Sequence, residues 1–389
     1  MNPFTEKSRV IVTCNNRLSP WLQKETELLG YHLVRNFATG IELFENVFDC
    51  IRLNMKLRCA SQILYSLKTF RADGPSDIYD ELMDIPWEEL ISADEYFSVT
   101  SQVDHPSITT PLYANVKVKD AIVDRIRNKE GRRPDSGPSA ERIVVHLFWK
   151  EQQAEIFLDT SGETLAKHGY RKIPGKAPML EALASATILA SAWNGRSPFV
   201  NPMSGSGTLA IQAALLATNR FPGLFRDNYG FMHIKGYEDD WYKKELALLK
   251  SGITARPDGV KIIATDISED AIEVSKINAG LAGVESEIEF SVCDFAETEV
   301  PAGETGIVYF NPEYGERLGI NKDLEALYGR IGDFLKKSCQ GYFGYVFTGN
   351  LELAKKIGLK PRRRYEFYSA KIDCRLLEYE LYAGSRDKV

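Results

Sequence analysis

Alternation of strand-like and helix-like segments over residues 170–389 constrains the fold more than any other feature of this chain. Apolar runs rich in β-branched and aromatic residues recur between segments of helical periodicity, at 198–201, 261–266, 288–294, 306–310 and 341–347. Repeated β-α units of this kind build a parallel sheet covered by helices. The last runs, 365–372 and 375–382, are too close for a crossover connection and must pair antiparallel. The sequence predicts an α/β fold in which a Rossmann-like parallel sheet ends in an antiparallel hairpin.

The segments that connect these strands are not all alike. Residues 178–193 are rich in Ala and Leu and predict a helix before the first strand, and 208–218, 268–280 and 324–336 predict helices between later strands. The stretch 221–256 shows no sustained periodicity. We expect it to be a loop-rich insertion.

Residues 1–165 have a different pattern, which predicts α+β structure. To about residue 60, we expect strands at 9–14 and 31–34 and helices at 20–30 and 60–67. From 61 to 165, the pattern predicts a helix at 112–127 and a β-hairpin formed by 142–149 and 154–158. At about 100–200 residues per domain the chain has room for two or three domains. We place the boundaries at 1–60, 61–165 and 166–389.

Composition excludes several classes of protein. The formal net charge of −6 argues against indiscriminate nucleic-acid binding but allows a local basic face. The six cysteines have no close pair and the five histidines form no HExxH pattern, so neither a disulfide scaffold nor a metal site is expected. No apolar run approaches the ~18 residues of a membrane-spanning helix, and the start of the chain has no secretory signal. We expect a cytoplasmic protein with reduced thiols, no metal and no membrane segment.

A local excess of positive charge lies between residues 117 and 133, where seven cations accompany three anions. The cations are Lys117, Lys119, Arg125, Arg127, Lys129, Arg132 and Arg133. A solvated helix face would have this composition, and so would a surface that contacts phosphates. A second basic run, Lys360 with Arg362 to Arg364, allows the same two interpretations.

A glycine-containing loop, Asn201-Pro-Met-Ser-Gly-Ser-Gly-Thr208, follows the first predicted strand of the α/β region. Gly205 and Gly207 would let the backbone approach a ligand at the carboxyl end of that strand, where open α/β sheets bind ligands. The segment 205–210 also fits the G-x-G-x-x-A dinucleotide pattern, so the loop alone does not identify a cofactor.

Carboxylates follow the next two predicted strands. Asp266 can accept both hydroxyls of a ribose, and Asp294 can accept from the amino group of an adenine. Helix capping or a turn would explain either residue on its own. Together they favour a nucleoside cofactor at the carboxyl edge of the sheet.

The motif Asn311-Pro-Glu-Tyr-Gly-Glu-Arg-Leu-Gly319 directly follows the predicted strand 306–310. An exocyclic amine is a poor nucleophile because its lone pair is delocalised into the ring. The Asn311 amide oxygen and the Pro312 carbonyl could accept its hydrogens and aim that lone pair, so that positioning supplies much of the rate. The Tyr314 ring could stack on a base swung out of its helix. This motif indicates group transfer to a nucleobase amine.

Taken together, these motifs resemble those of the THUMP-domain guanine-N2 RNA methyltransferases of large-subunit ribosomal RNA and their shorter, single-catalytic-domain bacterial relatives. The resemblance covers most of the chain and also rests on Lys119-Asp-Ala-Ile122, Arg133-Pro-Asp135, Leu158-Asp-Thr-Ser-Gly-Glu163, His168-Gly-Tyr-Arg171 and Cys374-Arg-Leu-Leu377. It implies a ferredoxin-like unit at 1–60, a THUMP RNA-binding domain at 61–165, and a class I methyltransferase domain at 166–389.

The resemblance implies S-adenosylmethionine as cofactor and N2 of a guanine in RNA, most simply 23S ribosomal RNA, as methyl acceptor, with adenine still open. The cofactor-binding residues would be Asn201, Met203, Ser204, Gly205, Gly207, Asp266, Ile267, Asp294 and Phe295. Asn311, Pro312 and Tyr314 would be catalytic. RNA would be bound by Lys117, Lys119, Arg125, Arg127, Arg132, Arg133 and Arg171. The sequence indicates no oligomeric state.

Two departures from the family pattern leave an alternative open. Asn201 stands where the family usually has Asp, so we expect a weaker hold on the cofactor ammonium, by about 1–2 kcal/mol. Glu313 replaces a second proline, which removes a restraint on φ in the catalytic loop. The alternative is a catalytically weak RNA-binding protein. A nicotinamide dehydrogenase, suggested by the 205–210 pattern, would leave 311–314 and the N-terminal half without a function.

Overall fold

The computed structural model describes residues 2–108, 110–173, 178–191, 193–303, 305–314 and 322–382. The chain forms two compact units, and neither is continuous in sequence. The first comprises Met1–Cys14, Leu22–Ala166 and Pro222–Ser251, and the second comprises Asn15–Trp21, Lys167–Phe221 and Gly252–Val389. One boundary between them falls within helix α1 (Ser19–Leu28).

The first unit is built on one mixed sheet, which has eight strands within the described residues, in the order β2-β3-β1-β4-β8-β7-β5-β6. The strands are β1 (Ser8–Thr13), β2 (Arg35–Phe37), β3 (Gly40–Glu45), β4 (Gln62–Arg71), β5 (Tyr96–Asp104), β6 (Asp135–Ser136), β7 (Ile143–Lys150) and β8 (Gln153–Asp159). Because β4 pairs with both β1 and β8, residues before and after 60 share this sheet. The expected hairpin is present as β7 and β8.

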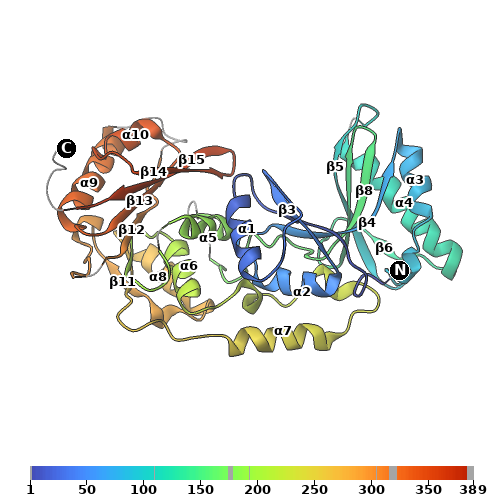
Figure 1. The fold of residues 1–389 in the computed structure, drawn as a ribbon, viewed down its shortest axis with the longest axis horizontal. Helices are drawn as coiled ribbons and strands as arrows, with labels where there is room; N and C mark the ends of the chain where they lie inside the picture. The colour runs from blue at the N-terminus through green and yellow to red at the C-terminus, as the bar shows by residue number, and fades with distance from the viewer. Residues whose placement is uncertain are drawn as a thin grey trace. The chain divides into compact units, whose positions relative to one another are not determined.

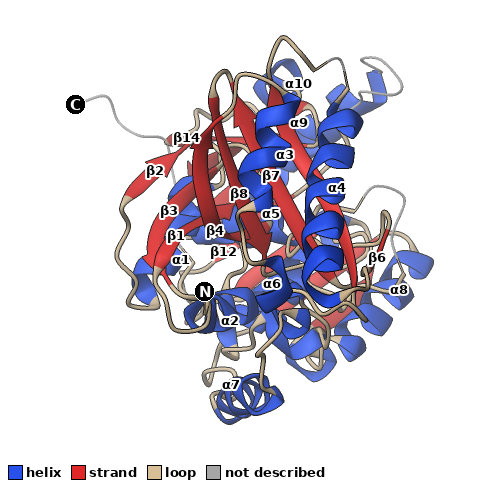
Figure 2. Cartoon of the chain, turned by 90° about the vertical axis from the view of Figure 1, so that its right-hand side faces the viewer, coloured by secondary structure: helices blue, strands red, loops and turns tan. Residues whose placement is uncertain are grey.

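Helices of the first unit cover this sheet. They are α2 (Val47–Lys56), α3 (Pro75–Met83) and α4 (Pro111–Glu130), with a short 3₁₀ turn at Trp87–Glu89. Figure 2 shows α3 and α4 side by side in front of the strands. Helix α4 buries an apolar face that includes Val118, Ala121 and Ile122, and it ends at Gly131, whose φ of 71° forms a left-handed cap. The predicted helix at 112–127 is therefore confirmed.

The stretch expected to be a loop-rich insertion contains a helix and belongs to the first unit. After 3₁₀ turns at Pro222–Phe225 and Gly230–His233 comes α7 (Asp239–Ser251), which is 13 residues long. Close backbone contacts hold this excursion in place, since a Cβ at Gly230 would lie 2.3 Å from the Asp159 carbonyl oxygen. Trp241 of α7 packs on Phe4 with ring centroids 4.9 Å apart.

Two local predictions in the N-terminal region were wrong, and one helix was not predicted. Residues 60–67 do not form a helix but lie largely in β4, because pairing with β1 and β8 outweighs local propensity. The strand expected at 31–34 is displaced to β2, which begins at Arg35. Helix α2 was not anticipated, although Asn46 caps it by accepting a hydrogen bond from the Asp49 N–H at 2.9 Å.

The second unit contains the predicted α/β sheet, which has seven strands within the described residues, in the order β11-β10-β9-β12-β13-β15-β14. The strands are β9 (Phe199–Pro202), β10 (Ile262–Asp266), β11 (Glu289–Val292), β12 (Ile307–Phe310), β13 (Phe343–Thr348), β14 (Arg363–Ser369) and β15 (Ile372–Glu380). The first five in chain order pair in parallel, and β15 is antiparallel to both β13 and β14. The Rossmann-like class I methyltransferase architecture with its terminal hairpin is confirmed.

The helices of this unit connect its strands and cover the sheet. They are α5 (Glu181–Ala190), α6 (Thr208–Ala217), α8 (Glu269–Leu281), α9 (Lys322–Ser338) and α10 (Leu351–Lys355). Figure 1 shows α9 and α10 beside the last strands, coloured orange to red. Tyr328, Ile331 and Leu335 of α9 pack with Val346 of β13 and Leu377 of β15 in one buried cluster. This cluster holds α9 against β13 and β15.

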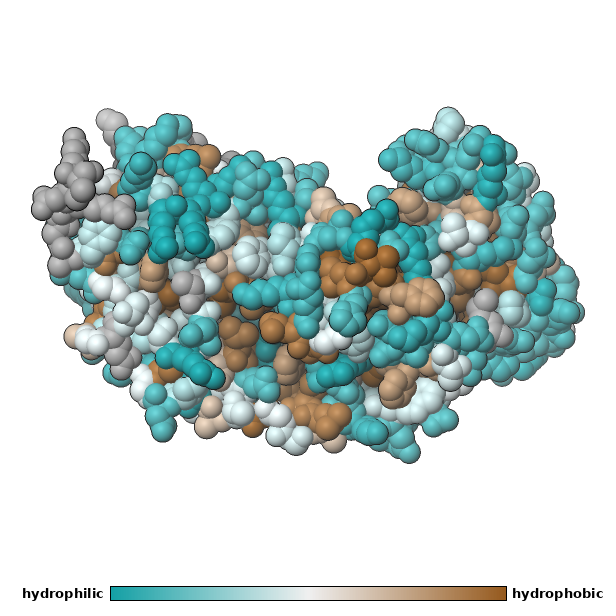
Figure 3. Space-filling model, viewed as in Figure 1, coloured by the Kyte–Doolittle hydropathy of each residue, from teal (hydrophilic) through white to brown (hydrophobic). Residues whose placement is uncertain are grey.

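The surface is consistent with a chain whose apolar side chains are mostly in these two cores. On the face drawn in Figure 3, hydrophilic residues cover most of the area and the apolar areas are small and separated. Individually exposed apolar residues of this kind are normal on a folded protein. Among the helices of the described residues, none combines the length and apolarity that crossing a bilayer requires.

Candidate active site

The glycine loop after β9 is shaped by left-handed residues at alternate positions. Met203, Gly205 and Gly207 have φ values of 58°, 58° and 79°. A Cβ at Gly207 would lie 3.0 Å from the Ser275 side chain, whereas a Cβ at Gly205 would meet nothing within 4 Å. Gly207 is therefore needed for packing against α8, and the Gly205 backbone faces open space. The loop leads directly into α6, so backbone N–H groups of a helix start are available to a ligand.

Asp266 at the end of β10 holds this loop. Its Oδ2 accepts from the Gly205 N–H at 2.9 Å and its Oδ1 from the Ser268 N–H at 3.0 Å. The Ser275 hydroxyl donates to the Gly205 carbonyl at 2.7 Å. Each Asp266 oxygen keeps a further lone pair, so the same carboxylate can also accept ribose hydroxyls. Ile267, the next residue, is 73% exposed.

Asp294 and Phe295 follow β11, at the next strand end along the sheet. Asp294 Oδ1 accepts from the Arg330 guanidinium at 2.7 Å and from the Ala296 N–H at 2.9 Å. Chiefly through Arg330, these bonds hold the pKa of Asp294 below its usual range. Phe295 is buried against Phe310, with Arg330 over its ring at 4.8 Å. Asp294 thus remains an acceptor while also capping a short turn.

The catalytic loop leaves β12 at Asn311 and is fixed by Tyr328 of α9. The Tyr328 hydroxyl lies 3.3 Å from the Glu313 carbonyl oxygen, to which it can donate, and 2.9 Å from the Thr348 hydroxyl. Pro312 is buried and the Glu313 side chain is exposed. This tie restrains the loop at the position where the family's second proline is missing. The remainder of the predicted motif, 315–319, lies outside the described residues.

Buried polar atoms without a protein partner gather at this edge of the sheet. Among the described residues they include Asn201 Oδ1, Ser204 Oγ and Asn311 Oδ1. The Asn201 Nδ2 is engaged, donating to the Tyr309 carbonyl at 2.9 Å across the β9–β12 pair. Buried acceptors are normally satisfied, so these atoms indicate a donor-rich ligand. An ammonium and an exocyclic amine are groups of that kind, and the residues present therefore fit a cofactor with an amino-acid end beside an amine substrate.

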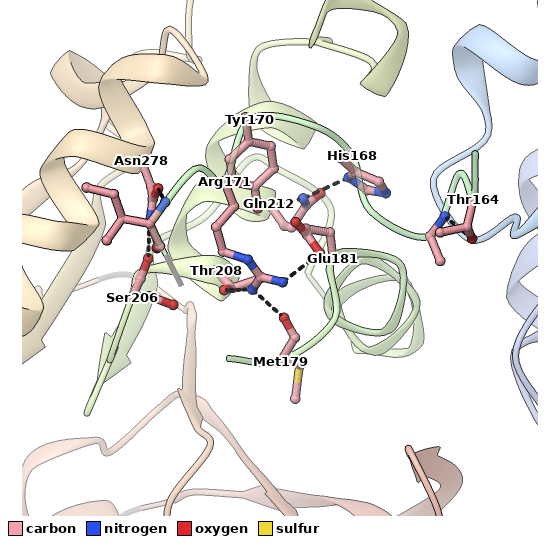
Figure 4. A network of polar contacts seen from close by, with 12 residues as sticks. Thr164, His168, Tyr170, Arg171, Met179, Glu181, Ser206, Thr208, Gln212 and Asn278 are labelled. Atoms are coloured by element: carbon pink, nitrogen blue, oxygen red, sulfur yellow. Dashed lines mark hydrogen bonds and ion pairs between the residues drawn. The ribbon is translucent and has the colours of Figure 1, made fainter. Parts of the chain in front are cut away.

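The polar side chains around Arg171 and Gln212, which Figure 4 shows, are by contrast hydrogen-bonded to one another. We call this group the paired cluster. The Arg171 guanidinium donates to the Met179 carbonyl at 2.8 Å, to Thr208 Oγ1 at 3.1 Å and to Glu181 Oε2 at 2.9 Å. Gln212 of α6 donates to the Tyr170 hydroxyl at 2.9 Å and contacts His168 Nδ1 at 2.9 Å. Burial raises the pKa of Glu181, and Arg171 partly offsets that effect.

Arg171, one of the predicted RNA-binding residues, lies in a buried ion pair. It was predicted to bind RNA, but its side chain is only 10% exposed and its guanidinium is occupied by three protein acceptors. A phosphate would have to displace a buried carboxylate to reach it. Arg171 instead connects the starts of α5 and α6, and so supports the cofactor loop.

The other predicted RNA-binding cations lie in the first unit, on α4 and in the segment that follows it. Four of them form ion pairs: Lys119 with Asp120, Arg125 with Glu88, Arg127 with Asp124 and Arg132 with Asp94. Lys117 and Arg133 have no ion pair among the described residues, although the Lys117 ammonium lies 5.8 Å from the centre of the Tyr113 ring. The excess positive charge predicted from the sequence is thus largely compensated by neighbouring acids.

Several supporting residues were missed by sequence reasoning. Tyr328, Arg330 and Ser275 act on the loops from α9 and α8, at separations of 15, 36 and 70 residues from the residues they hold. Nothing in their local sequence distinguishes them from ordinary helix residues. Among the described residues, no group of His, Cys, Asp and Glu side chains could hold a metal ion.

Comparisons with known proteins agree with this geometry. Residues 168–378 match the family model described as "RMKL-like, methyltransferase domain", and 75–159 match the THUMP domain. The "Ribosomal RNA large subunit methyltransferase K/L" of Allochromatium vinosum is 33% identical over 377 residues, which cover 94% of this chain and 50% of that protein. The protein slr0064 of Synechocystis sp., whose name proposes an RNA methyltransferase, is 30% identical over 362 residues. The aligned region covers 92% of this chain and 93% of that protein.

The fold is shared with solved structures. That of a "possible methylase" from Clostridium difficile 630 superposes with a TM-score of 0.87 at 26% identity, covering 98% of this chain and 100% of that one. The chain spans about half the length of the K/L relatives that it matches.

Proposed function

The chain belongs to the RMKL-like methyltransferase family, and on that premise we propose that it transfers a methyl group from S-adenosylmethionine to the N2 amine of a guanine in RNA. We propose 23S ribosomal RNA as the substrate, since the K/L relatives are named for the large ribosomal subunit. RNA binding is assigned to a THUMP domain at 61–165, following a ferredoxin-like unit at 1–60, and catalysis to 166–389.

The observation that carries this proposal is the buried Asn311 Oδ1 at the carboxyl end of β12, which has no hydrogen-bond partner among the described residues. A buried amide oxygen without a donor is costly unless a ligand supplies one. A purine amine can donate one hydrogen to this oxygen and the other to the Pro312 carbonyl. The nitrogen lone pair is then directed away from the base plane and becomes available for attack. Tyr314, three residues on, is the proposed stacking surface for the extracted base.

The cofactor supplies an electrophilic methyl group on a positively charged sulfur. Asn201 Oδ1 and Ser204 Oγ are proposed to bind its ammonium, and the backbone at Gly205 and Gly207 its carboxylate. Asp266 would accept the ribose hydroxyls and Asp294 the adenine amine, with Met203, Ile267 and Phe295 beside them. In the reaction, a nitrogen–carbon bond forms as the carbon–sulfur bond breaks, and sulfur retains the electron pair.

The product nitrogen then carries an extra proton, which must leave. Glu313 is exposed, so its carboxylate does not occupy the buried edge where the sulfur charge disappears in the transition state. The proton can pass to solvent. The neutral amide at 201 also has a function that a carboxylate lacks, because its Nδ2 donates to the Tyr309 carbonyl.

The proposal extends to cellular context. All six cysteines lie within the described residues and none of them forms a disulfide, as expected for the reducing cytoplasm where ribosomal RNA is modified. We propose this location, with RNA as the macromolecular partner.

The decisive experiment combines cofactor titration with methyl transfer. Calorimetry with S-adenosylmethionine should give one site, and labelled methyl should appear in ribosomal RNA from cells that lack this protein. Nucleoside analysis is expected to give N2-methylguanosine at a defined position. If the analysis instead gives N6-methyladenosine, the methyl acceptor is adenine and not guanine. Cofactor binding without transfer to any ribosomal RNA would contradict an enzyme and favour a catalytically weak RNA-binding protein.

A further inference from the structure

The glycine that ends the strand beside the catalytic loop is confined by two side chains. A Cβ at Gly349, directly after β13, would lie 2.6 Å from Ile372 Cγ2 and 3.1 and 3.2 Å from Tyr314 Cδ2 and Cε2. Gly349 does not have a positive φ, so the backbone there would accept any residue. Glycine is required at this position by space alone. A Cβ at position 349 would overlap the Ile372 methyl and would displace the Tyr314 ring by a few tenths of an ångström.

Ile372 reaches this position because the terminal hairpin extends past the sheet. The last residue of β13, Thr348, pairs with Arg375, so β15 residues 372–374 lie beyond the end of β13. The turn of the hairpin contains Ala370 in the left-handed region, with φ of 54°. The tip thus lies at the carboxyl edge of the sheet, next to the catalytic loop.

Residues from the N-terminal part of the chain hold this tip. Arg17, in the segment Asn15–Trp21 of the second unit, donates to Asp373 Oδ1 at 2.5 Å and lies over the Tyr368 ring at 4.4 Å. Arg375 also bonds to Asp373, and together the two cations lower the pKa of that carboxyl. Trp21 stacks near Phe367 with centroids 6.4 Å apart. The tip is therefore braced by the segment Asn15–Trp21.

We propose that Gly349 and Ile372 are positioning residues that set the ring of Tyr314 against the target base, with Arg17 as the brace of the hairpin that carries Ile372. This inference rests on the proposed function, because it gives the ring its substrate. Tyr328 completes the arrangement, since its hydroxyl ties Glu313 to Thr348 and so keeps the two loops in register. A displaced ring would misplace the base and its amine, and errors of about 1 Å can cost about 100-fold in rate.

The test uses the full-length protein and compares Gly349→Ala, Ile372→Leu and the double variant. Leucine lacks the branch at Cβ, so Ile372→Leu removes the methyl that a side chain at position 349 would strike. We expect Gly349→Ala to lower kcat/KM for RNA at least about tenfold while the Kd for S-adenosylmethionine changes less than about twofold. The double variant should return to within about threefold of wild type. Gly329→Ala, where the nearest atom would be 4.0 Å away, is the matched control and should behave as wild type.

Two results would overturn the inference. One is a Gly349→Ala protein with wild-type kinetics, and the other is a folded double variant that regains nothing. If Gly349→Ala does not fold, Ile372→Ala replaces it, and a wild-type kcat/KM in that variant counts against the inference.

If the wild-type protein methylates no RNA, the proposed function fails but the positioning claim does not fail with it. Crystal structures of wild type, Gly349→Ala and the double variant then decide the matter. The Tyr314 ring should be displaced in the single variant and restored in the double, and an unmoved ring contradicts the inference.

Discussion

Two clusters of buried polar groups in the methyltransferase unit differ in whether their members have hydrogen-bond partners. This difference distinguishes groups that support the fold from groups that bind a ligand. Below the glycine loop, the Arg171 guanidinium and the Glu181 carboxylate are buried and paired with each other. At the carboxyl edge of the same sheet, oxygens of Asn201, Ser204 and Asn311 are buried and have no partner within the described residues. A paired group stabilises the fold, whereas an unpaired buried group destabilises the free protein, and we propose that at this edge the ligand supplies the missing partner. The same division applies to the cations of the first unit.

The largest effect is expected from breaking the paired cluster. Arg171→Ala leaves the Glu181 carboxylate buried without its cation, and should lower the free energy of unfolding by about 3–5 kcal/mol. Denaturant titration measures it. Replacing both partners with Arg171→Met and Glu181→Leu should recover part of the loss, because no charge is then stranded. A single variant as stable as wild type would remove the distinction between the clusters.

Removing an unpaired oxygen should lower activity and leave stability nearly unchanged. Asn311→Ala is expected to lower methyl transfer about 100- to 1,000-fold, as losses of a single positioned hydrogen-bonding group in other active sites do. Its unfolding free energy should be unchanged or slightly higher, since Oδ1 has no hydrogen-bond partner among the described residues. Single-turnover rates and thermal melts on the same preparation provide both quantities. A large loss of stability would show that the oxygen has a structural partner.

The cofactor end offers a smaller, sharper test. Asn201→Ala removes an acceptor for the ammonium, and the Kd for S-adenosylmethionine should rise about tenfold. Asn201→Asp restores the family's charge but loses the bond that Nδ2 donates to the Tyr309 carbonyl. We therefore expect Asn201→Asp to destabilise the fold even where it improves cofactor binding. Calorimetry and melting temperature separate the two effects, and a gain in both would contradict this account.

The smallest effect concerns RNA. Lys117→Ala with Arg133→Ala removes two cations that have no ion pair within the described part of the chain, and should lower RNA affinity several-fold and reduce the salt slope by about one to two units. Arg127→Ala with Arg132→Ala removes two cations already paired with Asp124 and Asp94, and should have less effect. Filter binding at several salt concentrations compares them. Equal losses of RNA affinity in the two double variants would show that ion pairing of these cations does not affect RNA binding.

The fold of the second unit could be predicted because its signals are local and repeated. Each strand and helix carries its own periodicity, and the short connection between β14 and β15 leaves only an antiparallel pairing. In the first unit, 60–67 suits a helix locally, and only pairing with β1 and β8 makes it a strand. That information is distributed over residues far along the chain, such as Asp159, which pairs with Leu64.

The site divides in the same way. Which strand ends carry polar residues follows from sequence order, so Asn201, Asp266 and Asn311 could be named as candidates. Whether a polar atom is already occupied depends on partners from elsewhere in the chain. The partners of Arg171 could not be predicted for this reason, because Glu181 and Thr208 meet it only in the folded unit.

The excursion at Pro222–Ser251 has a consequence for how this protein is made. Gly230 packs against the Asp159 carbonyl, and Lys56 pairs with Glu245 at 3.0 Å, so the first unit needs α7 to be complete. During synthesis, the strands of its sheet have all emerged before α7, which joins the unit only after Ser251 has left the ribosome, by which time α6 of the second unit has already emerged. Neither unit can be excised by one cut. The two units therefore complete their folding at about the same stage of synthesis. Fragments that contain only one of them should depend on chaperones or aggregate.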